Sequence, residues 1–123
     1  MKRRQKHGKS ILQKADRWDR CYLCMSCDGD YRPKAYLETH HVLFGAGRRK
    51  KAEEDGLTVR LCKEHHDQVH KDDQIRQRLC SVAQAAWERK HLVEYGETVR
   101  AKWLERYIKD YRRIVDGTDN WDY

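Results

Sequence analysis

Two short segments decide the fold of this chain: Glu38–His41, with the sequence ETHH, and Leu61–His70, with the sequence LCKEHHDQVH. Five of the seven histidines lie in these segments. A cysteine pair, Cys21 and Cys24, lies upstream with two residues between its members. Histidine and cysteine are the usual protein ligands of zinc and related metals, so the pattern predicts metal binding.

The composition of the chain favours one small domain that is stabilised by bound metal. Hydrophobic residues make up 38% of the 123 residues and charged residues another 38%, which is a thin supply for a core. The five cysteines are an odd number, and no N-terminal apolar run resembles a signal peptide. We therefore expect metal binding in a reducing cytoplasm rather than a disulfide framework, and no membrane partner.

The net charge of +7 is concentrated near the N-terminus. Residues 1–20 carry eight Lys or Arg and two Asp, whereas residues 72–123 carry ten charges of each sign. We interpret residues 1–20 as a basic arm with a short helix over residues 11–20. Such an arm suits a polyanion, most simply nucleic acid, and the alternative is a solubilising tail.

The residues after the arm predict two strands and a helix. Mixed polarity over residues 35–42 and alternation over residues 57–61 indicate the strands, and residues 63–70 suit a helix that starts just after Cys62. Residues 48–55 suit one or two helical turns closed by Gly56. The predicted order is therefore that of a ββα unit.

Two more helices are expected after this unit. Apolar residues at helical spacing predict one helix over residues 72–90 and another over residues 97–115, with a break between them. The predicted fold class is α+β: a small ββα-metal unit over residues 21–71, followed by a helical extension over residues 72–123 that packs on it.

The first predicted metal site combines two ligand pairs. Cys21 and Cys24 form one pair, and Cys62 and His65 form a second pair with the same spacing. Four such ligands suit a structural zinc ion. Cys27 competes for a place in this site, but four ligands exist without it, so we interpret it as a free thiol.

The second predicted metal site uses the other histidines. On a helix His66 and His70 project from one face and can share a metal, whereas His65 is rotated by about 100° from His66 and can point to the structural zinc. On a strand His40 and His41 point to opposite faces. One of these two can therefore bind metal while the other has a different role.

The chain resembles the HNH endonucleases of the ββα-metal superfamily. The cysteine pairs resemble the zinc-knuckle branch of that family, and the paired histidines resemble its colicin-type nucleases. The resemblance covers residues 21–71 and is carried by Glu38-x-His40-His41 and Cys62-x-x-His65-His66-x-x-x-His70.

This resemblance implies a phage-encoded or prophage-encoded endonuclease that hydrolyses DNA phosphodiester bonds with one divalent metal ion. It implies that His41 is the general base that activates water, and that Glu38 is an acidic residue beside the site. It also implies that His40, His66 and His70 hold the catalytic metal, which is Mg, Mn, Ni or Zn. The expected location is the cytoplasm of the bacterial host cell.

One position departs from the family pattern. The middle residue of the HNH motif is usually an Asn that helps to hold the first histidine, but the only Asn of this chain is Asn120. The matching position falls near Gly56 or Leu57. Substitution by backbone groups of that loop is one interpretation, and a slower active site is the other.

Basic residues in and after the loop between the strands are candidate nucleic-acid contacts: Arg48, Arg49, Lys50, Lys51 and Arg60. Phosphate binding is one interpretation of this set and a solvated basic face is the other. DNA is the expected partner, together with phage or recombination proteins.

Two other functions remain open from the sequence. The chain suits a zinc-stabilised nucleic-acid-binding module without catalysis, or a structural zinc protein that serves protein partners. The tryptophans Trp18, Trp87 and Trp103, and also Cys80, are expected to pack inside the protein rather than to stack on bases or bind metal.

Overall fold

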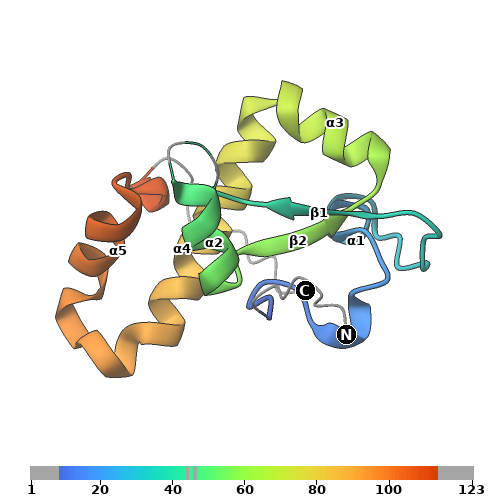
Figure 1. Cartoon of the computed structure of the whole chain (residues 1–123). Helices are drawn as coiled ribbons and strands as arrows, with labels where there is room; N and C mark the ends of the chain where they lie inside the picture. The colour runs from blue at the N-terminus through green and yellow to red at the C-terminus, as the bar shows by residue number, and fades with distance from the viewer. Residues whose placement is uncertain (1–8, 44, 46, 114–123) are drawn as a thin grey trace, which may run out of the picture.

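A two-stranded antiparallel hairpin lies at the centre of the computed structural model, which describes residues 9–43, 45 and 47–113 (Figure 1). Strand β1 (Glu38–His41) pairs with β2 (Thr58–Leu61), and Thr39 lies opposite Arg60. Helix α3 (Lys63–Lys71) follows β2 and lies along one face of the hairpin. The predicted α+β class is confirmed, although the first strand is shorter than the expected residues 35–42.

Helix α1 (Tyr22–Asp28) stands where the sequence predicted only a cysteine knuckle. Cys21 is its N-cap, and the Sγ atom of Cys21 accepts a hydrogen bond from the backbone N–H of Cys24 at 3.4 Å. Gly29 ends the helix in the left-handed conformation. The helix therefore fixes the two cysteines on one turn of backbone.

The helix expected over residues 11–20 is wrong, apart from the short 3-10 turn η1 (Ala15–Arg17). The hydroxyl oxygen of Ser10 accepts hydrogen bonds from the backbone N–H groups of Leu12 and Gln13, at 3.1 and 3.0 Å, which holds a turn instead. The Gln13 side chain then accepts from the backbone N–H of Arg60 at 2.9 Å. This segment thus lies against β2.

The helix predicted between the strands is confirmed as α2 (Arg48–Asp55), and Gly56 closes it with a φ of 75°. A Cβ atom on Gly56 would lie 2.1 Å from the carbonyl oxygen of Lys9, because the backbone of the N-terminal segment passes directly over this residue. The backbone N–H of Ile11 donates to the Gly56 carbonyl at 2.9 Å. Glycine is thus required here both by conformation and by space.

We expect Gly56→Ala to destabilise the protein by more than the about 1–2 kcal/mol that left-handed strain costs an ordinary residue. The added methyl group must displace the Lys9 backbone, and a fall in melting temperature of about 10 °C or more should follow. Gly29→Ala is the matched control, since Gly29 also caps a helix at positive φ but a Cβ atom added to it would meet no atom within 4 Å. Thermal unfolding followed by circular dichroism compares the two variants. Equal melting temperatures would show that the Lys9 backbone does not lie directly over Gly56.

The two predicted C-terminal helices are confirmed, with different bounds. Helix α4 (Asp73–Tyr95) is capped by the Asp72 side chain and continues through the break expected at residues 91–96, because no helix-breaking residue precedes Gly96. After the turn η2 (Gly96–Thr98), α5 (Val99–Tyr107) ends where Ile108 adopts a φ of 75°. The turn η3 (Tyr111–Arg113) follows, and residues 114 and 115 of the predicted helix lie outside the described residues.

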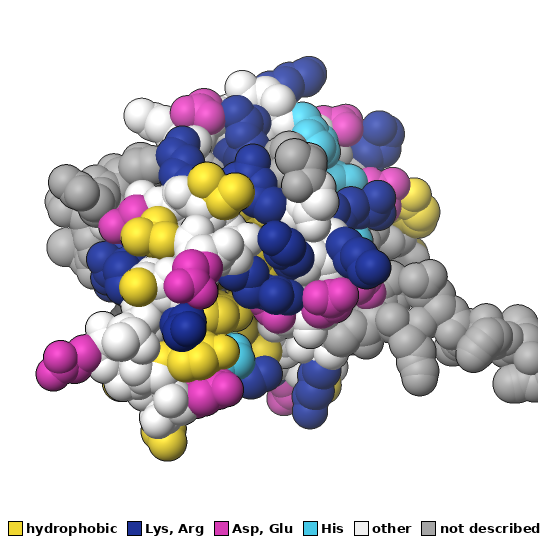
Figure 2. All heavy atoms as spheres, turned by 60° about the vertical axis from the view of Figure 1, so that its left-hand side comes forward, with side chains coloured by type: hydrophobic (Ala, Val, Ile, Leu, Met, Phe, Trp, Pro, Cys, Tyr) yellow, Lys and Arg dark blue, Asp and Glu magenta, His cyan; other side chains and the backbone are white. Residues whose placement is uncertain are grey.

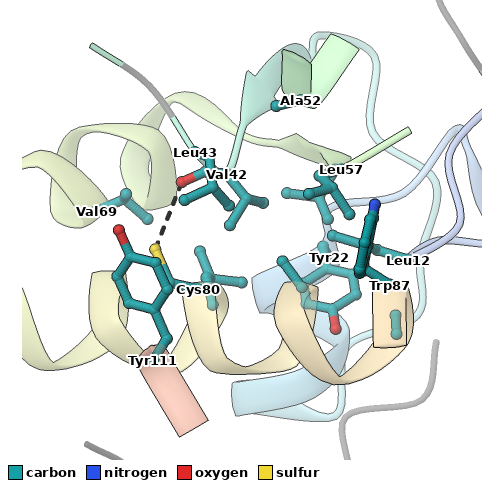
Figure 3. Packing of buried hydrophobic residues seen from close by; sticks show 14 of the residues in the cluster. Leu12, Tyr22, Val42, Leu43, Ala52, Leu57, Val69, Cys80, Trp87 and Tyr111 are labelled. Atoms are coloured by element: carbon teal, nitrogen blue, oxygen red, sulfur yellow. Dashed lines mark hydrogen bonds between the residues drawn. The ribbon is translucent and has the colours of Figure 1, made fainter. Parts of the chain in front are cut away.

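The core lies between the hairpin and α4 (Figure 3). Val42 and Leu57, which flank the facing ends of the strands, pack toward Cys80 and Trp87 of α4. The Cys80 thiol donates to the Val42 carbonyl at 3.6 Å, and burial raises the pKa of this thiol to about 12. The expected core positions of Cys80, Trp87 and Trp103 are confirmed, whereas the expectation for Trp18 is wrong, since Trp18 is only half-buried and lies outside the core. None of the helices within the described part of the chain has the length and apolar character of a membrane span.

A charged group ties α2 to both C-terminal helices. The Asp55 carboxylate accepts hydrogen bonds from Trp87 Nε1 at 3.0 Å, Arg106 Nε at 2.6 Å and the Tyr107 hydroxyl at 2.5 Å. Burial, and then the hydrogen bond to Asp55, raise the pKa of Tyr107 above its usual range, so the phenol remains a donor. We call this set of four residues the Asp55 junction. It fixes the position of α2 beside the hairpin.

Candidate metal centres

The four residues predicted to hold a structural zinc come together in the structure. Cys21 and Cys24 are supplied by the start of α1, and Cys62 and His65 by the start of α3. One ligand atom from each lies within 4.8 Å of all the others. Cys21 and Cys24 are buried and Cys62 and His65 are half-buried, so the cluster lies at the junction of the two helices with one side near the surface. We call it the Cys/His cluster.

The distances inside the Cys/His cluster match tetrahedral zinc. Zinc bonds of about 2.3 Å to sulfur and about 2.0 Å to nitrogen place two tetrahedral sulfurs about 3.8 Å apart, and a sulfur and a nitrogen about 3.5 Å apart. The Sγ atoms of Cys24 and Cys62 are separated by 3.9 Å. His65 Nδ1 lies 3.5, 3.4 and 3.5 Å from the Sγ atoms of Cys21, Cys24 and Cys62. The cluster can therefore hold a zinc ion.

Groups around the Cys/His cluster favour the same interpretation. His65 turns its Nδ1 atom to the sulfurs and its Nε2 atom toward the Asp28 carboxylate, 3.6 Å away. A carboxylate on the outer nitrogen is the usual way in which a zinc-bound histidine is oriented. Burial raises the pKa of the Cys21 and Cys24 thiols when no cation is present. Metal binding must then displace protons, and affinity should fall in acid.

Cys27 lies outside the Cys/His cluster. It is exposed on α1, and none of the candidate metal groups among the described residues includes it. Its sulfur is 4.0 Å from the Ser26 hydroxyl. This placement agrees with the interpretation of Cys27 as a free thiol.

The three histidines predicted to hold a second metal also come together. One nitrogen from each of His40, His66 and His70 lies within 4.8 Å of the others. The ring centroids are 5.3 Å apart for His40 and His66, 5.9 Å for His40 and His70, and 5.1 Å for His66 and His70. His40 is buried and His70 is exposed, so this three-histidine cluster opens to solvent on one side. Three protein ligands leave a coordination position for water or substrate, unlike the four ligands of a closed structural site.

Glu38 orients the three-histidine cluster. Its carboxylate accepts a hydrogen bond from His66 Nδ1 at 2.5 Å, which leaves His66 Nε2 as the nitrogen available to a metal. The hydroxyl of Tyr36 donates to the other carboxylate oxygen at 2.8 Å. These hydrogen bonds, that of His66 first, lower the pKa of Glu38. Glu38 is therefore a charged outer partner of the cluster.

His40 is held in the state that a metal ligand requires. Burial on β1, and then the neighbouring imidazoles His66 and His70, lower the pKa of His40 to about 3. The imidazole is therefore neutral at ordinary pH, and a neutral imidazole offers a nitrogen lone pair to a cation.

His41 lies on the other side of β1 and contacts α2 instead of α3. Its Nε2 atom makes a short hydrogen bond to the Glu53 carboxylate, and Arg49 Nε donates to His41 Nδ1 at 3.4 Å. The sequence led us to expect the backbone near Gly56 and Leu57 to hold His41, and Glu53 was missed. One signal was present, since a helix over residues 48–55 places Arg49 and Glu53 four positions apart on one face.

Some of the five candidate phosphate contacts are exposed, and others form hydrogen bonds within the protein. Lys50 and Arg49 are exposed. Arg48 donates to the Tyr111 hydroxyl at 3.2 Å and Lys51 to the Arg106 carbonyl at 3.1 Å, so these two also attach α2 to the C-terminal segment. Arg60 lies on β2, on the far side of the hairpin from α3. Figure 2 shows Lys and Arg side chains gathered across the face on which α2 and α5 lie, with histidines near its upper edge.

Comparisons of this chain with protein-family models, with curated proteins and with solved structures found no match.

Proposed function

We propose that this protein is a metal-dependent endonuclease of the HNH type that hydrolyses DNA phosphodiester bonds. The observation that carries the proposal is the pairing of an open three-histidine cluster with a histidine on the neighbouring position of the same strand. His40 belongs to the cluster and His41 does not. One-metal hydrolysis requires a metal ion and a base close to the same phosphate, and two adjacent residues of one strand can supply a ligand for the first and the group for the second.

The three-histidine cluster is the proposed catalytic metal site, and the Cys/His cluster is the proposed structural site. His40, His66 and His70 would hold a divalent cation, with Glu38 keeping His66 in the correct tautomer through its Nδ1 atom. When bound, the cation supplies charge stabilisation at the scissile phosphate and the leaving oxygen. An all-imidazole set suits Zn or Ni, while Mn and Mg would rely on water and phosphate oxygens to complete their shells.

The contacts of His41 identify the nitrogen that acts as the base. Its Nε2 atom is engaged by Glu53 and carries the proton that the carboxylate accepts. The Nδ1 atom therefore keeps its lone pair and is the atom that takes a proton from water. As His41 becomes positively charged, the Glu53 carboxylate stabilises it.

Arg49 connects the base to the substrate in this proposal. Its guanidinium lies 3.4 Å from His41 Nδ1, on an exposed helix surface. A phosphate oxygen is a stronger partner for a guanidinium than a neutral imidazole nitrogen is. A phosphodiester would therefore draw Arg49 away from His41, open Nδ1 to water and lie beside the base.

The proposed function is tested by nicking of supercoiled plasmid. We expect zinc-loaded protein to convert plasmid to the open circle when Mg, Mn, Ni or additional Zn is present, and we expect His70→Ala to need at least tenfold more metal for the same rate. Loss of an outer partner alone typically weakens a metal site about 10–100-fold, and loss of a ligand costs at least as much. His70 is exposed, so its truncation leaves the core intact.

Gln68→Ala is the matched control, because Gln68 is also exposed on α3 but belongs to neither cluster. It should nick at the wild-type rate. Absence of nicking with every metal, in protein that still retards DNA in a gel, would overturn the nuclease proposal in favour of a zinc-stabilised DNA-binding module.

A further inference from the structure

A recess lies on the side of the hairpin that faces away from the three-histidine cluster. Thr39 lines it, whereas the next residue, His40, belongs to the cluster, because neighbouring strand residues point to opposite faces. Figure 1 shows the same arrangement, with α3 above the hairpin and the N-terminal segment before α1 below it. The recess has a volume of about 360 Å³, which is within the range of small-molecule sites.

The walls of this recess combine an aromatic ring with cationic and polar groups. Trp18 and Arg60 line it, together with Lys9 and Thr39. The Arg60 guanidinium lies over the Trp18 ring, 5.5 Å from its centroid. Trp18 is only half-buried, so part of the indole stays open. An open indole beside a guanidinium is suited to stacking on a flat ring and binding an adjacent negative charge.

Arg60 keeps hydrogen-bonding capacity for a ligand. Its Nε atom is buried and has no hydrogen-bond partner among the described residues, and NH1 reaches the Thr39 hydroxyl only at 3.5 Å, the outer limit of such a bond. Its backbone N–H is already satisfied by Gln13. A buried guanidinium N–H without a partner is unfavourable, and a phosphate oxygen would satisfy it.

The charge around the recess selects an anion. Lys9 and Arg60 line it, and none of the described residues that line it is an Asp or Glu. A nucleotide has both groups that the recess can bind: a flat base for the Trp18 ring and a phosphate for the Arg60 guanidinium.

We propose that this recess, the Trp18 pocket, binds one nucleotide of single-stranded DNA, with the base stacked on Trp18 and its phosphate on Arg60. The inference rests on the proposed nuclease function. The pocket and the three-histidine cluster lie on opposite faces of the same two-stranded hairpin, so one DNA strand that passes around the hairpin could contact both. The pocket would thus hold an unpaired strand close to the position of cleavage and would favour substrates with single-stranded segments.

The test uses a short oligodeoxythymidylate that carries a fluorophore and one 5-bromodeoxyuridine, with zinc-loaded full-length protein and no second metal. Ultraviolet irradiation should crosslink the bromouracil to the peptide that contains Trp18. Fluorescence anisotropy should show about 5-fold to 150-fold weaker binding for Trp18→Ala, as expected for one lost base stack, while Trp18→Phe keeps most of the affinity.

Tyr31→Ala is the matched control. The Tyr31 ring also has a guanidinium above it, that of Arg17 at 5.5 Å, and it is 39% exposed, but Tyr31 does not line the pocket. Its loss should leave binding unchanged. Competition with thymidine monophosphate distinguishes a free nucleotide from a nucleotide within a DNA strand. If the monophosphate displaces the oligonucleotide, a free nucleotide also occupies the pocket. If it does not, the pocket requires a strand.

A crosslink at another peptide, or equal affinity of folded Trp18→Ala and wild type, would overturn the inference. Because no cleavage is measured, these results are independent of the nicking assay. Binding that depends on Trp18 in a protein that never nicks would retain the pocket and reject the nuclease. A protein that nicks plasmid but binds the oligonucleotide equally well with and without Trp18 would retain the nuclease and reject the pocket.

Discussion

Cys62→Ser should abolish the folded state of this protein at 25 °C. Cys62 supplies one of the four ligand atoms that join the start of α1 to the start of α3. Structural zinc contributes about 10–16 kcal/mol in small modules, whereas the whole unfolding free energy of a domain is about 5–15 kcal/mol. A cluster with three ligands cannot retain most of that contribution, so circular dichroism should show loss of helix.

Cys27→Ser is the control for this experiment, because Cys27 is a cysteine on the same helix as Cys24 but lies outside the cluster. It should bind zinc and melt as the wild type does. Zinc released on treatment with a thiol reagent provides a second measurement, in which the wild type and Cys27→Ser release the same amount. A Cys62→Ser protein that is folded and keeps this zinc would disprove the assignment of the ligands.

His41→Ala should lower the rate of plasmid nicking about 10²–10⁴-fold without changing the amount of bound zinc. Loss of a general base, the role proposed for His41, typically costs this much, and His41 belongs to neither of the two candidate metal clusters. Single-turnover nicking at saturating metal isolates the chemical step from binding.

Replacements of Glu53 test how His41 is held. Glu53→Ala removes the acceptor for His41 Nε2, and loss of a hydrogen bond to a charged group, worth about 1.5–3 kcal/mol, should slow nicking about tenfold to a hundredfold. Glu53→Gln keeps an oxygen acceptor and should retain more of the rate. Glu54→Ala is the matched control, since Glu54 is the next residue but pairs with Arg106 on the surface. Wild-type rates in all Glu53 variants would show that His41 is positioned by other groups.

The sequence predicted the Cys/His cluster because its ligands come in pairs with fixed local spacing. Cys21 and Cys24 are on one turn of α1, and Cys62 and His65 are on the first turn of α3. Only the meeting of the two pairs depends on the fold, and zinc chemistry favours that meeting strongly. The same holds for His66 and His70, which any helix over residues 63–70 places on one face.

The partner of His41 could not be predicted in this way. Glu53 reaches His41 only because α2 lies beside β1, and the position of α2 depends on contacts with residues more than thirty positions later in the chain, such as Trp87 and Arg106. The path of residues 10–13 was missed for a related reason. Helical periodicity suggested a helix there, but the hydrogen bonds of Ser10 and the backbone of Gly56 determine a different conformation.

The Asp55 junction limits how far the part of the chain that holds both candidate metal clusters can be moved as a module. Residues 21–71 contain both metal clusters, but a fragment cut at residue 71 would leave Asp55 without its donors Trp87, Arg106 and Tyr107. Helix α2, with Glu53 on it, would lose the anchor that aligns it with the strand. The smallest transplantable unit therefore begins at Lys9, whose backbone passes over Gly56, and extends through Tyr111. A fusion partner is best joined outside those limits.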